Sequence, residues 1–107
     1  MLFSHENPGD RGYWLEVKGD SMTPVQGNGF TPGMRILIQP EGFDLISGKF
    51  YVAKLMPSGD TTLKQYVRDA GTEFLKPLNP LYPMITVTDD VQIIGRVIDS
   101  RLPASFL

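Results

Sequence analysis

The sequence predicts one mostly-β domain, a coiled or barrel-like sheet with at most short helical turns. Nine prolines and eleven glycines among 107 residues disfavour long helices. No segment keeps an apolar period of 3.6 residues over roughly ten positions, whereas several short runs are rich in β-branched and aromatic residues. The hydrophobic fraction of 41% suffices for a modest core in a single domain of this length.

The expected elements follow one another between turn-forming residues. Residues 1–12 are polar and are interpreted as a tail or linker remnant, which leaves residues 13–107 as the domain. Strands are expected, in chain order, at residues 14–17, 35–38, 50–55, 61–68, 73–76 and 91–99.

Proline and glycine define the connections between these strands. Residues 57–60 and 69–71 predict tight turns that join the middle strands as hairpins. The glycine-rich segment 19–33 is a long connection, and long loops in compact domains tend to be functional or mobile. Three prolines interrupt the stretch from residue 77 to 83. Residues 91–98 form the longest β-branched run, a candidate interface or edge strand.

Composition excludes several function classes. The net charge of −2 argues against nucleic-acid binding by this chain itself, since such binding needs a basic face. The absence of cysteine excludes disulfides and fits a reducing, cytoplasmic setting. No apolar run is long enough for a bilayer, and no signal peptide is evident. One histidine and scattered carboxylates predict no metal site, and no cofactor is expected.

The remaining residues favour serine–lysine chemistry. Ser21 lies in the segment Gly19-Asp20-Ser21-Met22, where a sharp turn would expose its Oγ and direct the N–H groups of Ser21 and Met22 at an oxyanion. The single histidine, His5, lies in a polar segment with no sign of an oriented imidazole. Lys64 lies midway along an expected strand among apolar residues, where desolvation would lower its pKa and make it a base.

Each of these residues also has an ordinary structural interpretation. A serine after Gly-Asp is typical of a turn or helix N-cap, and a lysine on a strand is usually a solvated charge. The spacing of the two residues in the sequence is compatible with either interpretation. The residues alone therefore leave the question open.

The chain resembles the self-cleaving repressor family, which comprises LexA, the UmuD-type mutagenesis proteins and the lambdoid phage repressors. Within the family it is most similar to the C-terminal domain of the phage repressors, through Met22-Thr23-Pro24 and the stretch 79–84. Four stretches carry the resemblance, in the family's order. They are residues 14–22, residues 32–38 followed by 40–41, residues 63–69, and a fourth set made of 74–80, 82–85 and 94–98.

The resemblance implies a LexA- and signal-peptidase-like β fold in which Ser21 attacks a peptide bond upstream in its own chain, with Lys64 as the base. It implies stimulation of this self-cleavage by a RecA filament during the SOS response. It also implies a homodimer or higher homo-oligomer that supports cooperative operator binding. Operator DNA would be bound only through an N-terminal helix-turn-helix domain, which this chain does not contain.

The family's usual scissile bond, Ala-Gly, is missing upstream of the serine. No such pair occurs among the twenty residues before Ser21, and Ala70-Gly71 is interpreted as a hairpin turn. The chain is accordingly expected to be a fragment without its own cleavage site.

Three alternative functions are retained. A non-catalytic oligomerisation module would carry the serine and lysine incidentally, and a UmuD-like polymerase-accessory protein would be less similar in sequence. A signal-peptidase relative would share the chemistry, but the sequence lacks a membrane segment.

Overall fold

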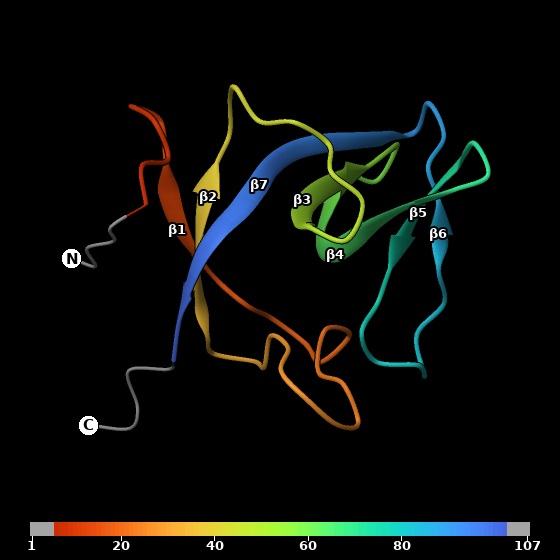
Figure 1. The fold of residues 1–107 in the computed structure, drawn as a ribbon, viewed down its shortest axis with the longest axis horizontal. Helices are drawn as coiled ribbons and strands as arrows, with labels where there is room; N and C mark the ends of the chain where they lie inside the picture. The colour runs from red at the N-terminus through yellow and green to blue at the C-terminus, as the bar shows by residue number, and fades with distance from the viewer. Residues whose placement is uncertain (1–5, 103–107) are drawn as a thin grey trace.

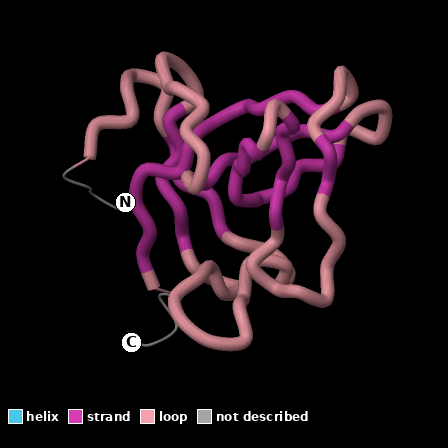
Figure 2. The backbone as a smooth tube through the Cα atoms, turned by 45° about the vertical axis from the view of Figure 1, so that its right-hand side comes forward, coloured by secondary structure: helices cyan, strands magenta, loops and turns pink. Residues whose placement is uncertain are grey.

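The computed structural model describes residues 6–102 and contains only strands, turns and loops in that range (Figures 1 and 2). No helix among these residues has the length and apolarity needed to cross a membrane. All six strands expected from the sequence are present, and a seventh, β6, lies in the proline-interrupted stretch. The strands are β1 (Tyr13–Glu16), β2 (Arg35–Gln39), β3 (Phe50–Leu55), β4 (Asp60–Asp69), β5 (Thr72–Lys76), β6 (Ile85–Thr86) and β7 (Val91–Arg101).

The strands form one antiparallel sheet in the order β1-β2-β7-β3-β4-β5-β6. Strand β7 runs diagonally through the middle of the molecule and pairs with β2 on one side and β3 on the other (Figure 1). The expectation that residues 91–98 form an edge strand is therefore wrong. In the central position, partners on both sides satisfy the backbone N–H and C=O groups of this long run.

The sheet coils because the pairing register shifts at two places along β7. One shift lies between Leu37 and Ile38 of β2, and the other between Val52 and Ala53 of β3. Gly95 sits beside these irregularities, and a Cβ added to it would come within 2.3 Å of Ile38 Cγ2. Such β-bulges increase the local twist and bend the strand, so that the two ends of the sheet face different directions.

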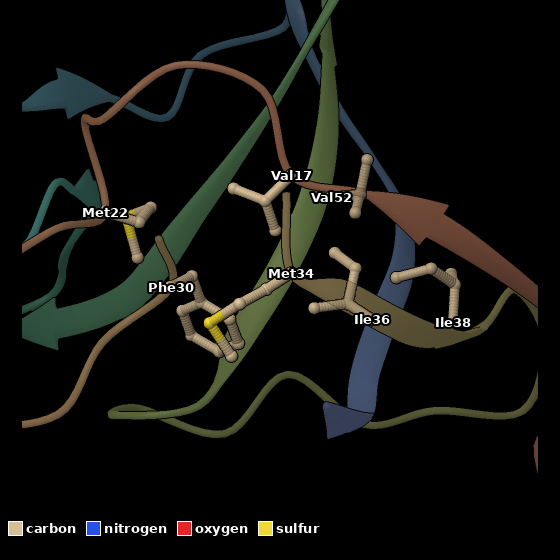
Figure 3. Packing of buried hydrophobic residues seen from close by; sticks show 7 residues of the cluster. All are labelled: Val17, Met22, Phe30, Met34, Ile36, Ile38 and Val52. Carbon is tan, nitrogen blue, oxygen red and sulfur yellow. The ribbon is translucent and has the colours of Figure 1, made fainter. Parts of the chain in front are cut away.

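Two apolar clusters stabilise the coiled sheet. The first lies beneath the connection between β1 and β2 and includes the 1%-exposed Met22 (Figure 3). The second is centred on Tyr51 and Tyr66, whose rings meet edge to face at 5.9 Å. The members of the first cluster are Val17, Met22, Phe30, Met34, Ile36, Ile38 and Val52.

The fold brings the connection between β1 and β2 close to β4, although these segments are far apart in the sequence. The connection contains no strand, as the glycine-rich segment 19–33 predicted. It is nevertheless anchored, because Val17 exchanges backbone hydrogen bonds with Met34 and Gly33, and Phe30 N donates to Met22 O at 2.8 Å. These bonds fix the loop that carries Ser21.

Candidate active site

Ser21 occupies a tight turn whose neighbour is locked into the core. Thr23 N donates to Asp20 O at 3.0 Å, which closes a β-turn with Ser21 and Met22 at its two central positions. The side chain of Met22 is buried in the first apolar cluster, whereas Ser21 is only half-buried. The turn therefore presents Ser21 at a surface while its neighbour prevents the loop from moving.

Lys64 lies on a strand, as the sequence predicted, and it is buried, which the residues alone had left open. It is 6% exposed and lies on β4 directly opposite Tyr51 of β3. Strand alternation places Tyr66, which is fully buried, on the same face, while Leu63 and Val67 belong to the other face. Burial lowers the pKa of the Lys64 amine from its ordinary value.

The two side chains meet across the fold. Lys64 Nζ lies 3.0 Å from Ser21 Oγ, although the residues are 43 positions apart in the sequence. The amine has two further neighbours, Thr62 Oγ1 and Leu63 O, the latter at 3.1 Å. None of the ion pairs found among residues 6–102 involves Lys64. A neutral amine fits this environment, since it donates two hydrogens to oxygens and keeps one lone pair for the serine hydroxyl.

The N–H groups of Ser21 and Met22 remain free within the described part of the chain. Neither donates a hydrogen bond to another residue in the range 6–102. This is the usual state of amides at the central positions of a β-turn, whose closing bond joins the outer residues. The two groups thus keep a donor capacity that no residue in this range uses.

A cleft of about 160 Å³ opens beside the serine. It lies between the end of β1, the start of the following loop and the first half of β4. Such a volume suits one or two residues of an extended peptide better than a drug-sized ligand, for which about 300–1,000 Å³ is typical. Its lining residues are Leu15, Glu16, Val17, Lys18, Ser21, Met22, Ile36, Val52, Thr61, Thr62 and Leu63.

Two residues at this site were not predicted from the sequence. Thr62 contacts the Lys64 amine, and its position two residues earlier on the same strand face could have indicated this. Asn79 is buried, donates from Nδ2 to Asp20 O at 3.2 Å and donates from its backbone N to Ser21 O at 2.9 Å. No local pattern links Asn79 to a turn 59 positions upstream.

The other residues considered in the sequence lie away from this pair or outside the described range. Ala70 and Gly71 form the turn between β4 and β5 with φ values of 51° and 82°, which fits the interpretation of this pair as a turn. His5 lies outside the described residues. Within residues 6–102, no three histidine, aspartate or glutamate side chains are grouped closely enough to hold a metal ion.

The fold and the site together define an all-β domain with a buried lysine facing a serine at the mouth of a small cleft. A family model described as Peptidase S24-like matches residues 2–98. This chain belongs to the Peptidase S24-like family.

The relatives with which the chain aligns are repressors and transcriptional regulators. It is 49% identical over 90 residues to repressor protein C2 of Salmonella phage P22, covering 84% of this chain and 41% of the repressor. It is 44% identical over 84 residues to the HTH-type transcriptional regulator for conjugative element SXT of Vibrio cholerae, covering 78% and 39%. It is 35% identical over 92 residues to the LexA repressor of Verrucomicrobium spinosum, covering 83% and 41%. The chain thus spans less than half the length of these relatives.

Proposed function

We propose that this chain is the C-terminal domain of a phage- or prophage-type transcriptional repressor and acts as a self-processing serine peptidase. Ser21 is the nucleophile and Lys64 the general base in this proposal. One observation carries it: a lysine amine that is 6% exposed and has no carboxylate partner among residues 6–102 lies 3.0 Å from a serine hydroxyl. That distance is within the range that nucleophile activation requires, about 2.6–3.2 Å.

The first half of the reaction forms an ester on Ser21. Neutral Lys64 takes the proton from Ser21 Oγ while Oγ bonds to the carbonyl carbon of the scissile peptide bond. The carbonyl oxygen becomes an oxyanion, which the N–H groups of Ser21 and Met22 stabilise. When the carbon–nitrogen bond breaks, the Lys64 ammonium returns the proton to the leaving amine.

The second half restores the serine. Lys64, neutral again, takes a proton from a water molecule whose oxygen attacks the ester carbonyl. The ester bond to Oγ breaks, a carboxylic acid leaves, and the proton passes back to Ser21. In this proposal the two side chains, the two amides and water carry out both halves of the reaction.

The substrate in this proposal is a peptide bond in the same polypeptide, of the Ala-Gly type that the family resemblance implies. Ala70-Gly71 is unsuited to this role because its backbone is committed to the turn between β4 and β5. An intramolecular substrate gives a high effective concentration, which allows a modest site to act on one bond. The resemblance also supports RecA-filament stimulation of the cleavage.

Cleavage in trans tests the catalytic assignment. The domain is incubated at alkaline pH with a separate polypeptide carrying an Ala-Gly bond in the linker of a related repressor. We expect slow cleavage by the unmodified domain, because the intramolecular advantage is lost. Ser21→Ala removes the nucleophile and Lys64→Ala the base, so each is expected to reduce cleavage to background.

A surface variant serves as the control. Gln39, at the end of β2 and outside the cleft, donates an exposed side-chain hydrogen bond to Glu41 O. Gln39→Ala removes this bond, and the variant domain is expected to cleave like the unmodified one. Cleavage that survives Ser21→Ala or Lys64→Ala in folded protein would exclude the proposed pair. A folded domain that never cleaves would instead favour the non-catalytic oligomerisation module.

A further inference from the structure

We propose that Asn79 is a positioning residue for the catalytic serine, an inference that rests on the proposed function and goes beyond it. Asn79 lies in the loop between β5 and β6, far from Ser21 in the sequence. It makes no contact with the Lys64 amine, whose partners are Ser21, Thr62 and Leu63. Its action would therefore be on the backbone of the nucleophile turn.

Asn79 holds both peptide groups that flank the Ser21 Cα. Its Nδ2 donates to Asp20 O at 3.2 Å, and its backbone N donates to Ser21 O at 2.9 Å. A peptide group is planar, so fixing its carbonyl fixes the whole plane. The plane before Ser21 rotates with φ of Ser21, and the plane after it rotates with ψ. With both planes held, the direction of the Ser21 Cα–Cβ bond is fixed. Rotation about this bond then brings Oγ within reach of Lys64, and the contact with Nζ at 3.0 Å selects that rotamer.

The same two bonds orient the amides that would receive the oxyanion. In a trans peptide the C=O and the N–H point to opposite sides of the chain. Asp20 O shares its peptide plane with the N–H of Ser21, and Ser21 O shares its plane with the N–H of Met22. When Asn79 binds the two oxygens, both N–H groups are turned away from Asn79 and left without partners in the described chain.

Asn79 is itself firmly held, as a positioning residue must be. It is 9% exposed, its Oδ1 accepts from Leu81 N at 3.0 Å, and its carbonyl accepts from Tyr82 N at 3.1 Å. The preceding Leu78 packs against the first apolar cluster. Hydrogen bonds to its side-chain amide and its backbone, together with the packing of Leu78, therefore hold Asn79 in place.

The test measures the reactivity of Ser21 towards a fluorophosphonate probe as a function of pH. In this reaction Oγ bonds to phosphorus, fluoride leaves, and Lys64 takes the hydroxyl proton. The phosphoryl oxygen gains charge in the transition state, as the carbonyl oxygen of a peptide would. Rates are followed by intact mass spectrometry and expressed per folded molecule, with folding measured by thermal unfolding of each variant.

Asn79→Ala removes the bond to Asp20 O but keeps the backbone bond to Ser21 O, so it loosens the peptide plane that carries the Ser21 N–H. We expect the maximal rate at alkaline pH to fall by about 100-fold, the loss that a misplaced reacting group produces. The pH midpoint is expected to stay at the unmodified value, because the surroundings of Lys64 are unchanged. Asn79→Asp keeps the shape of the side chain and the contact with Leu81 but loses the donor to Asp20 O. It provides the test if Asn79→Ala does not fold, and it is expected to react slowly as well. Gln39→Ala removes a bond of the same chemistry, a side-chain amide to a backbone carbonyl, and is expected to react at the unmodified rate.

A maximal rate within about 2-fold of the unmodified domain in folded Asn79→Ala and Asn79→Asp would overturn the proposal, since a purely structural role changes stability but not the rate per folded molecule. A Ser21 that fails to react in the unmodified domain, or reacts equally in Lys64→Ala, would overturn the proposed function and this inference with it. Normal reactivity that depends on Lys64 but not on Asn79 would overturn this inference alone.

Discussion

At the scale of single residues, the central feature is a lysine kept in a setting that disfavours its charge. Lys64 is buried, and burial lowers the pKa of its amine. An amine whose pKa is lowered has a larger neutral fraction near physiological pH, and only the neutral form accepts a proton. The same burial makes the folded protein less stable than it would be with an apolar side chain at this position.

Replacing this lysine by methionine tests the cost of burial. The pKa of Lys64 is lower in the folded than in the unfolded chain, so between the two values the unfolded chain binds more protons. The free energy of unfolding of the unmodified protein therefore increases as pH rises through this window. Lys64→Met lacks this titration. Its stability relative to the unmodified protein is therefore expected to fall as pH rises, by about 1.4 kcal/mol for each unit by which folding lowers the pKa of Lys64.

Denaturant unfolding of both proteins from neutral pH to about pH 10 measures the difference. The contacts that methionine fails to make with Thr62 and Leu63 add a constant and leave the slope unaffected. Parallel stability curves for the two proteins across this range would mean that the pKa of Lys64 is not lowered.

At the scale of elements, local patterns predicted the strands and the two hairpins β3–β4 and β4–β5, but not the pairings between strands distant in the sequence. The run 50–55 matches β3 at both ends, because its apolar, β-branched and aromatic residues and the following turn define it locally. The two-residue β6 was missed, since Ile85–Thr86 is too short to produce a period and lies among prolines. The central place of β7 was also missed, because strand order depends on contacts between distant segments and not on the strand's own composition.

In the candidate site, too, features set by nearby residues could be predicted and contacts between distant segments could not. A turn at Ser21 and a strand around Lys64 followed from nearby residues, but their separation of 3.0 Å did not, and the family resemblance was needed to pair them. The role of Asn79 could not be predicted, because its contacts are made to backbone carbonyls. Every residue has such a group, so the sequence does not mark which one is bound.

At the scale of the whole molecule, the coiled sheet acts as a frame that holds three separate segments together. The turn at Ser21 comes from the connection between β1 and β2, the lysine from β4, and Asn79 from the loop after β5. The bulges along β7 bend the sheet enough for these segments to meet on one side (Figure 1). The site therefore depends on the entire fold and not on a contiguous motif.

Self-association is the second property proposed for the whole molecule. We propose it because the family resemblance implies a homodimer or higher homo-oligomer that supports cooperative operator binding. Sedimentation velocity is expected to show a dimer at micromolar concentration, and Ser21→Ala should leave the association unchanged because Ser21 lies in the cleft. A monomer throughout the high micromolar range would contradict this part of the proposal.

The most direct test of the central claim is the pH dependence of cleavage in trans by the unmodified domain. If Lys64 is the base, the rate depends on its neutral fraction. We expect a rate that rises from neutral to alkaline pH and levels off below the ordinary lysine pKa of 10.5, because burial has lowered the pKa of this amine. A rate that is flat over this range, in a protein that stays folded throughout, would contradict the assignment of Lys64 as the base that activates Ser21.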